Sequence, residues 1–344
     1  MGNIDVFSFD DVLLIPQKSK VQTRSDVDLT TQIGYLNMRT PIVSSPMDTV
    51  TGSKMASAMS AAGGLGILHR YNTIEQQVSM VRSAIAQSPG SLAAAVGVTG
   101  DYIHRMRSLL AVGCHVFCLD IAHGHHIAME SALKSTRDAF GNDVILIAGN
   151  VATADGYSDL AEWGADIVRV GIGGGSICST RTQTGHGLPT LYSVAIASAI
   201  RKASGATALI MADGGIRSAG DMVKSLAFGA DLCMLGSMLA GTNESPGEII
   251  TCKAGVKKKV YRGMASKEAQ QDWKGRARSL EGISSTVEMK GPVSDILSEL
   301  TFNIKSGLSY TGSKSIKDFQ DRVKYVLQTP AAQVEGSTHI LRSK

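Results

Sequence analysis

The chain has 344 residues, 43% of them hydrophobic, which is enough to bury a large core in one barrel or in two smaller domains. Its 34 basic and 30 acidic residues leave a formal charge of +4, and the basic residues are scattered apart from Lys257–Lys259. This balance argues against nucleic-acid binding but suits a phosphorylated substrate. The sequence has no secretory leader pattern and no apolar run of about 18 residues, so we expect a soluble, cytoplasmic protein without a membrane partner.

Eight short β-branched runs alternate with longer, Ala-rich, helix-patterned stretches. The runs begin near Pro41, Gly64, Leu92, Val116, Val144, Ala165, Ala208 and Ala230. Successive starts lie 21 to 28 residues apart with one exception, which is close to one strand, one helix and two turns. Eight such units predict an α/β protein, a (β/α)8 TIM barrel in one domain over residues 1–344. The rival, a doubly wound sheet, usually has fewer units and a dinucleotide fingerprint near its first strand.

The exception is a 43-residue interval after the sixth strand, which leaves a surplus segment, GIGGGSICSTRTQTGHGLPT, at residues 171–190. Long irregular segments in compact folds are usually functional, and barrel active sites lie at the carboxyl ends of the strands. We therefore predict a catalytic loop at 171–190. A second surplus covers residues 244–290 after the eighth strand, and its charged, glycine-punctuated sequence predicts a flap over the same mouth.

The five cysteines include no CxxC pair, which fits free thiols in a reducing compartment. Cys178 differs from the others because it lies on the predicted loop, beside Ser179, Thr180 and Arg181. A cysteine on an exposed polar loop is a candidate nucleophile. The remaining cysteines are expected to be packing residues: Cys114, Cys118, Cys233 and Cys252.

Glycines follow the seventh and eighth strands, where barrel enzymes commonly bind phosphate. They are Gly214, Gly215 and Gly236, the last followed by Ser237. Glycine lets backbone N–H groups approach phosphate oxygens, and the serine adds a hydroxyl. Asp213, just before the glycines, is placed to accept hydrogen bonds from a ribose diol. The alternative is that these glycines only end their strands in tight turns.

Two further patterns are less specific. The glycine-rich segment 171–176 opens a loop rather than a helix, which disfavours a dinucleotide site. Its carbonyls can instead bind a monovalent cation such as K⁺, for which the candidate residues are Gly173, Gly175, Cys178 and Arg181. The histidines at 123, 125 and 126 include two adjacent residues and no second ligand cluster, so we expect a loop that lines the pocket rather than a metal site.

Six segments together resemble the IMP dehydrogenase / GMP reductase family, from about Phe7 to about Ser313. They are FDDVLLIPQKS, PIVSSPMDTVT, GLGILHR, GIGGGSICSTR, MADGGIRSAGD and MLGSMLAGTNESPGE. The resemblance implies a purine nucleotide substrate and a homotetramer. It assigns Cys178 as the nucleophile that attacks C2 of the purine, with Thr180 as its acid/base partner. It places the phosphate and ribose on Ser176, Asp213, Gly214, Gly215, Gly236 and Ser237.

Three features resemble GMP reductase more than IMP dehydrogenase. No CBS module interrupts the chain after the second strand, and residues 264–281 lack the Arg-Tyr pair with which the dehydrogenase activates water. CSTRTQTGHGLP, and the segment from Arg278 through Glu281 to Gly282, resemble the reductase. This resemblance implies NADPH-dependent conversion of GMP to IMP and ammonia. DIAHGHH and the N-terminal third favour the alternative, an IMP dehydrogenase without CBS modules that oxidises IMP to XMP with NAD. In that alternative, Arg276 or Arg278 would activate the water without the usual tyrosine.

The reductase resemblance also gives roles to the flap and to the cofactor side. Thr180 and Glu281 would protonate the amine at C2 so that it leaves as ammonia, because amide ion is a very poor leaving group. The base would contact Gly263, Met264, Ser266, Arg278 and Gly282. The cofactor would lie near Arg70, Asp120, His123, Gly124 and Asn150.

An inactive barrel and a barrel aldolase or isomerase are the other function classes. The presence of Cys178 and Glu281 disfavours the first, and the absence of a catalytic Lys or Glu at a strand end disfavours the second.

Overall fold

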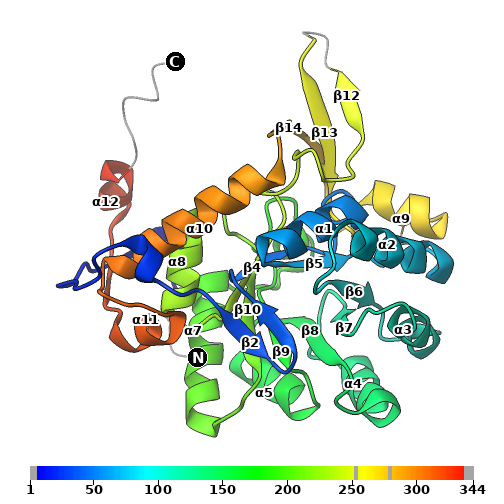
Figure 1. Cartoon of the computed structure of the whole chain (residues 1–344), viewed down its shortest axis with the longest axis horizontal. Helices are drawn as coiled ribbons and strands as arrows, with labels where there is room; N and C mark the ends of the chain where they lie inside the picture. The colour runs from blue at the N-terminus through cyan, green and yellow to red at the C-terminus, as the bar shows by residue number, and fades with distance from the viewer. Residues whose placement is uncertain (1–5, 252–254, 278–280, 337–344) are drawn as a thin grey trace.

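The structure, a computed structural model of the chain, describes residues 6–251, 255–277 and 281–336. Eight parallel strands close into a barrel in chain order, and the last strand pairs back to the first (Figure 1). The strands are β4 (Ile42–Ser44), β5 (Leu65–Leu68), β6 (Ala93–Val96), β7 (Val116–Asp120), β8 (Ile145–Val151), β9 (Ile167–Val170), β10 (Leu209–Asp213) and β11 (Leu232–Leu235). The predicted (β/α)8 TIM barrel is confirmed.

The barrel strands are buried on both faces. Side chains such as Val43, Ile67 and Ile147 fill the interior of the barrel in one fully buried cluster. Their neighbours in the sequence, such as Ile42 and Leu68, point outward into a second cluster against the helices. Because both faces of each strand are covered, the sequence of each strand is a continuous apolar run rather than an alternation of apolar and polar residues.

Helices surround the barrel and alternate with its strands (Figure 1). They are α1 (Ser53–Ala62), α2 (Ile74–Gln87), α3 (Tyr102–Leu110), α4 (Ile127–Phe140), α5 (Ala154–Glu162), α7 (Thr190–Ser204), α8 (Ala219–Ala227) and α10 (Val293–Ser309). Hydroxyls of Thr73, Thr153 and Ser218 accept backbone N–H groups in the first turns of α2, α5 and α8. None of the helices within the described ranges is long and apolar enough to cross a membrane.

A hairpin closes the amino-terminal end of the barrel. It consists of β2 (Thr31–Ile33) and β3 (Leu36–Met38), and Leu36 and Met38 join the interior cluster. The Tyr35 hydroxyl at its tip donates to the carbonyl oxygen of His115 at 2.7 Å. With the interior filled at this end, ligand access is left to the carboxyl ends of the strands.

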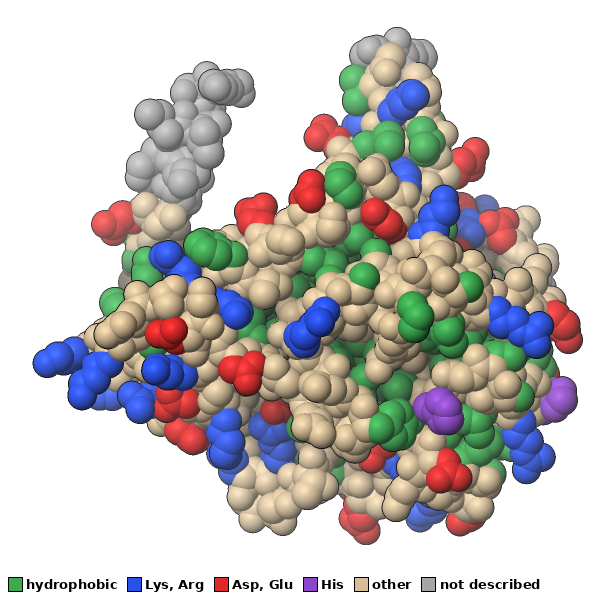
Figure 2. All heavy atoms as spheres, viewed as in Figure 1, with side chains coloured by type: hydrophobic (Ala, Val, Ile, Leu, Met, Phe, Trp, Pro, Cys, Tyr) green, Lys and Arg blue, Asp and Glu red, His purple; other side chains and the backbone are tan. Residues whose placement is uncertain are grey.

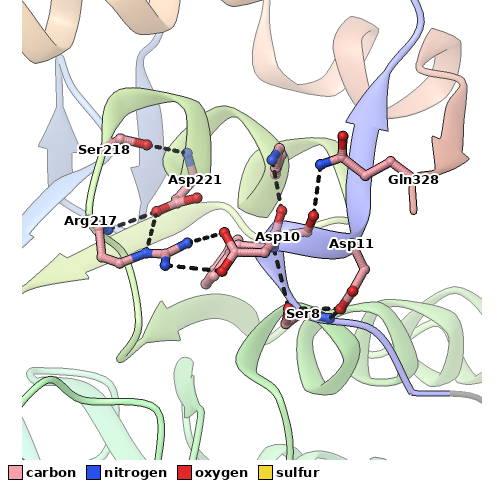
Figure 3. Close-up of polar contacts among 9 residues, drawn as sticks. Ser8, Asp10, Asp11, Arg217, Ser218, Asp221 and Gln328 are labelled. Atoms are coloured by element: carbon pink, nitrogen blue, oxygen red, sulfur yellow. Dashed lines mark hydrogen bonds and ion pairs between the residues drawn. The ribbon is translucent and has the colours of Figure 1, made fainter. Parts of the chain in front are cut away.

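The first and last described segments meet beside α8. Strand β1 (Val12–Leu14) pairs with β15 (Tyr325–Leu327). The neighbouring elements are η1 (Phe9–Asp11), η2 (Arg24–Asp26), α11 (Ile316–Arg322) and α12 (Pro330–Glu335). Figure 3 shows the Arg217 guanidinium between the carboxylates of Asp10 and Asp221, with Nη1 3.1 Å from Asp10 Oδ2. These contacts support the base of the loop that follows β10.

The two surplus segments lie over the mouth of the barrel. Residues 171–190 contain one short helix, α6 (Thr180–Thr184). Residues 244–290 form an antiparallel sheet and one helix: β12 (Ile249–Thr251), β13 (Lys257–Arg262), α9 (Lys267–Lys274) and β14 (Ser284–Glu288). The sheet projects from the body of the protein, and charged and hydrophobic side chains lie along it (Figure 2). We call residues 171–190 the loop and residues 244–290 the flap.

Candidate active site

A pocket of about 310 Å³ lies at the carboxyl ends of the barrel strands, between the loop and the flap. Most of the predicted site residues line it, although they come from every quarter of the chain. They are Arg70, Asp120, Asn150, Gly173, Gly175, Ser176, Cys178, Thr180, Asp213, Gly214, Gly215, Gly236, Ser237, Gly263, Met264, Glu281 and Gly282. The structure therefore brings the sequence-derived candidates for chemistry, phosphate binding and cofactor binding into one cavity.

Cys178, Thr180 and Glu281 form a hydrogen-bonded series. The Cys178 thiol donates to Thr180 Oγ1 at 3.2 Å, and the Thr180 hydroxyl donates to Glu281 Oε2 at 2.9 Å. Cys178 is exposed on the loop, whereas the other cysteines in the described residues are buried. The arrangement places a thiol, a hydroxyl and a carboxylate in series at the pocket wall.

Backbone pairing joins the loop to the flap around these side chains. Cys178 and Gly282 form an antiparallel bridge. On either side of it, Ser179 N donates to Glu281 O at 2.9 Å and Ile283 N donates to Ile177 O at 3.0 Å. The carboxylate of Glu281 is thus fixed relative to the thiol through main-chain contacts as well as through Thr180.

The phosphate candidates form a glycine-lined hollow. Gly214 and Gly215 have φ values of 95° and 79°, which side-chain-bearing residues rarely adopt. A Cβ added at Gly214 would lie 3.1 Å from Gly175 N, and one added at Gly236 would lie 3.0 Å from the Tyr261 hydroxyl oxygen. Glycine at these positions keeps backbone N–H groups accessible to an anion.

Tyr261 is a pocket residue that the sequence analysis missed. It extends from β13 of the flap, and its hydroxyl interacts with the hydroxyls of Ser176 and Ser237. Burial raises the pKa of Tyr261, so the phenol stays protonated and remains a hydrogen-bond donor at neutral pH. The signal in the sequence was one aromatic residue in the lysine-rich run KKKVYR, directly before the predicted base contacts.

Arg169 is the second missed residue. It lies in β9 and lines the pocket, where its guanidinium pairs with Asp120 and Asp213. Burial alone would raise the pKa of Asp120, but the charges of Arg169 and Arg70 outweigh burial and hold that pKa below its usual value. The signal was a charged residue inside the apolar run ADIVRVGI, since a buried charge requires a partner.

The cofactor candidates separate into two groups. Arg70 Nε lies 3.4 Å from Asp120 Oδ2, and both residues line the pocket beside Tyr71. The Tyr71 ring stacks on Trp273 of α9, with centroids 5.9 Å apart, so the flap also contacts the barrel here. Asn150 points away from Arg70 and Asp120, because its amide donates to Gly171 O at 2.9 Å and to Asp213 Oδ2 at 2.7 Å.

Several predicted residues do not line the pocket. His123 is exposed, and Gly124 is buried with its N–H donating to Asn150 O at 2.7 Å. The Ser266 hydroxyl accepts the Ala269 N–H and thereby caps α9 instead of facing the cavity. Arg278 lies outside the described residues, as does Cys252.

The cation candidates lie together at the base of the loop. Gly175 O accepts the Cys178 N–H at 3.1 Å. The Arg181 side chain packs over Gly173, where an added Cβ would lie 2.5 Å from Arg181 Cγ, and its guanidinium donates to Leu188 O. Arg181 itself does not line the pocket.

The histidine cluster is not arranged as a metal site in the part of the chain that the structure describes. No group of three or more His, Cys, Asp or Glu side chains there is placed to hold a metal ion. His125 Nε2 instead lies 2.7 Å from Asp159 Oδ2 of α5. The buried thiols of Cys114, Cys118 and Cys233 have their pKa raised to about 12 by burial, so they are not thiolates at neutral pH.

Comparisons with known proteins relate the whole chain to one family. The model of the IMP dehydrogenase / GMP reductase domain matches residues 6–339. An inosine-5′-monophosphate dehydrogenase of Nitrosopumilus maritimus is 32% identical, over 96% of this chain and 98% of its own length. A GMP reductase of Leishmania major is 31% identical, over 96% of each chain.

A solved structure extends the likeness to three dimensions. It is a GMP reductase from Trypanosoma brucei in complex with guanosine 5′-monophosphate, with a TM-score of 0.90 and 28% identity over 98% of each chain. Sequence, family model and fold agree, and the chain therefore belongs to the IMP dehydrogenase / GMP reductase family of oxidoreductases.

Proposed function

We propose that this chain is an NADPH-dependent GMP reductase, which converts GMP to IMP and ammonia through a covalent bond between Cys178 and C2 of the purine. The observation that carries the proposal is the hydrogen-bonded series Cys178, Thr180 and Glu281 at the pocket wall. Both reactions of the family need a nucleophile, but only the reductase must also protonate a departing amine. A hydroxyl and a carboxylate in series with the thiol suit that additional task.

The reaction divides into two halves on the Cys178 sulfur. The thiolate adds to C2 of GMP, the C2–N2 bond breaks, and the nitrogen leaves as ammonia after it takes up a proton. The purine is left as a thioimidate on sulfur, and bound NADPH would supply the hydride that reduces it. The C2–S bond then breaks with its electron pair returning to sulfur, which releases IMP. Sulfur serves both halves because it is a good nucleophile and a good leaving group.

Thr180 and Glu281 account for the proton in the first half. When Cys178 becomes a thiolate, its proton passes to Thr180 Oγ1, and the hydroxyl proton passes to Glu281 Oε2 over 2.9 Å. The carboxyl group then holds the proton that the departing amine requires. The group that activates the nucleophile is therefore also the acid for the leaving group.

The glycine-lined hollow would take the nucleotide phosphate. Backbone N–H groups at Gly214 and Gly215, the Ser237 hydroxyl and the protonated Tyr261 phenol supply neutral donors there. Asp213, at the carboxyl end of β10, then lies on the sugar side of that hollow. This order places the purine toward Cys178.

We assign the other side of the pocket to the dinucleotide. Arg70 brings positive charge that suits a diphosphate, and Tyr71 offers an aromatic ring to a planar group. Both residues line the same cavity as Cys178. We propose that Arg70, Tyr71 and Asp120 hold NADPH there.

The alternative function is an IMP dehydrogenase that uses NAD. The similarity to the Nitrosopumilus maritimus enzyme favours it, since that identity equals or exceeds those of the reductases. Against it, Arg276 of the flap is exposed and does not line the pocket. Arg262, the other described arginine of the flap, pairs with Asp48 and Asp272 and does not line the pocket either, so no described flap arginine is placed to activate water.

One assay separates the two functions. We expect the absorbance of the reduced nicotinamide to fall when GMP and NADPH are supplied together, with IMP and ammonia as products. IMP with NAD should give no sustained rise. A sustained rise with IMP and NAD, without turnover of GMP, would assign the chain to the dehydrogenase branch.

Two further properties belong to the same proposal. We propose that the enzyme is a homotetramer, to be checked by light scattering on the purified protein. We also propose that carbonyls of Gly173, Gly175 and Cys178, beside Arg181, bind K⁺ next to the nucleophile. The rate should then fall when K⁺ is replaced by tetramethylammonium at constant ionic strength.

A further inference from the structure

Arg169 joins two carboxylates that belong to different parts of the pocket. Its Nη1 lies 2.6 Å from Asp120 Oδ1, and its Nη2 lies 2.8 Å from Asp213 Oδ2. The Arg169 side chain is only 6% exposed, whereas Asp120 and Asp213 are 20% and 17% exposed. A single buried guanidinium thus connects the carboxylate on the proposed cofactor side with the one on the proposed sugar side.

The barrel geometry makes this connection possible. Asp120, Arg169 and Asp213 lie at the carboxyl ends of β7, β9 and β10, and β8 passes between the first two. The residue of β8 that pairs with Arg169 is Gly149. A Cβ at Gly149 would lie 2.6 Å from the Arg169 Cβ, so glycine leaves the room in which the arginine side chain crosses β8.

Asp213 is held through one of its two oxygens. Arg169 Nη2 and Asn150 Nδ2 both donate to Oδ2, at 2.8 Å and 2.7 Å. Among the described residues, none donates to Oδ1. A carboxylate that accepts two hydrogen bonds on one oxygen has a fixed orientation, and its other oxygen is left to accept hydrogen bonds from a diol.

We infer that Arg169 is a positioning residue, which fixes Asp213 for the ribose hydroxyls of the nucleotide and makes that site respond to Asp120. The inference rests on the proposed function for the identity of the ligand, a purine ribonucleotide. Arg169 acts on the sugar through Asp213. Its effect is therefore expected in the recognition of the hydroxyl groups rather than in the chemistry at C2.

Lysine is the informative replacement. Arg169→Lys keeps the positive charge, but a single ammonium group lacks the planar fork that reaches both carboxylates at once. Asp213 would then lose its fixed orientation while the net charge of the pocket stays the same. Asp120→Asn tests the other ion pair of Arg169, because it removes the negative charge that attracts the guanidinium toward β7.

The readout is the ratio of dissociation constants for deoxyGMP and GMP, measured by calorimetry without cofactor. The wild type and the variants all carry Cys178→Ala in this experiment, so neither ammonia release nor hydride transfer occurs. Both 2′-deoxyGMP and 3′-deoxyGMP serve as probes. For the wild type we expect GMP to bind roughly tenfold more tightly than the weaker analogue, as a hydrogen bond to a charged group implies. Arg169→Lys and Asp213→Asn should each bring the ratio close to unity, and the double variant should bring no further loss.

Arg201→Lys is the matched control. Arg201 pairs with Asp231, with similar burial, at the opposite end of the barrel. This variant should lower thermal stability and leave the ratio unchanged. If Arg169→Lys does not fold, Asp120→Asn carries the test, and the ratio should fall in the same direction.

The outcomes separate the inference from the proposed function. A wild type that binds neither GMP nor IMP would overturn the proposed function. The inference alone would be overturned by a second outcome, in which the wild type discriminates against deoxyGMP but Arg169→Lys lowers the affinities for GMP and deoxyGMP equally. An equal loss indicates that the arginine has only a structural role. An unchanged ratio in Asp120→Asn would remove the link to the cofactor side.

Discussion

Thr180 Oγ1 lies 2.9 Å from Glu281 Oε2, although 101 residues separate the two in sequence. Thr180 belongs to the loop after β9, and Glu281 belongs to the flap after β11. The main chains meet at the same point, where Ser179 N donates to Glu281 O at 2.9 Å. Neither segment contains both side chains, so the hydrogen bond depends on the contact between the flap and the loop.

Replacing Glu281 should separate the two halves of the proposed reaction. Glu281→Gln keeps the shape of the side chain but cannot take or give the proton that ammonia needs, so conversion of GMP should fall by about 10²–10⁴-fold. Reduction of NADP⁺ by IMP should stay near the wild-type rate in a single turnover at alkaline pH, where hydroxide can take the Cys178 proton in place of Glu281, because no amine leaves in that direction. Glu288→Gln on β14 of the flap is the control and should change neither rate. Equal loss in both directions would mean that Glu281 acts in binding or folding.

Replacing Cys178 should abolish turnover and leave nucleotide binding intact. In Cys178→Ala the phosphate hollow and Asp213 are untouched, so GMP should still bind in calorimetry while no ammonia is released. Cys233→Ala is the control because Cys233 is buried in β11, away from solvent. It should keep turnover and lower the free energy of unfolding by about 1 kcal/mol. A rate of even a tenth of the wild type in Cys178→Ala would rule out covalent catalysis by this residue.

The barrel was predictable because the sequence of each strand has a recognisable apolar pattern. Each strand is buried on both faces, and runs such as VILIAGNV therefore stand out from the helical stretches around them. The anomalous interval also corresponds to the long connection between β9 and α7. The sheet of the flap carried no such signal, since β12 and β14 are short and almost wholly exposed and therefore need no apolar pattern.

The site was predictable where its residues are close in sequence or belong to a known motif. Cys178 and Thr180 are neighbours on the loop, whereas the pairing of Thr180 with Glu281 followed only from the family resemblance. Arg169 was missed because its partners, Asp120 and Asp213, lie 49 and 44 residues away and meet it only when the barrel closes. A single charged residue in an apolar strand was the available signal.

The Tyr261 phenol should strengthen binding of the phosphate. Tyr261→Phe removes the hydroxyl that interacts with Ser176 and Ser237 and keeps the aromatic ring. We expect the KM for GMP to rise about tenfold with little change in kcat, since a hydrogen bond to a charged group is lost before and during the reaction alike. Guanosine, which lacks the phosphate, should bind the variant and the wild type equally. A matched loss for guanosine would place Tyr261 outside the phosphate site.

His69 should make the folded protein less stable in mild acid. Burial lowers the pKa of His69 below 6.5, and the nearby charge of Asp48 opposes this only in part. Below that pH the unfolded chain binds a proton at His69 that the folded chain excludes, so the stability that the neutral form provides is lost as the pH falls. The melting temperature of His69→Gln should therefore change less than that of the wild type between about pH 7.5 and 5.5. His104→Gln, at an exposed position of α3, is the control, and its melting temperature should change with pH as that of the wild type does.

The last prediction concerns the fate of the thioimidate when it is formed from IMP. Hydrolysis requires a base that deprotonates water, and the arginines among the described pocket residues, Arg70 and Arg169, are both bound to Asp120. The thiol proton passes through Glu281 to solvent, and the Glu281 carboxylate can then take a proton from ammonia, which is a far better nucleophile than water. IMP with NADP⁺ should therefore give reduced cofactor in an amount that matches the active sites, with little XMP, in a rapid-quench experiment. Added ammonia should restore steady turnover by converting the trapped thioimidate to GMP. Sustained release of XMP without ammonia would show that water is activated and that the chain works as a dehydrogenase.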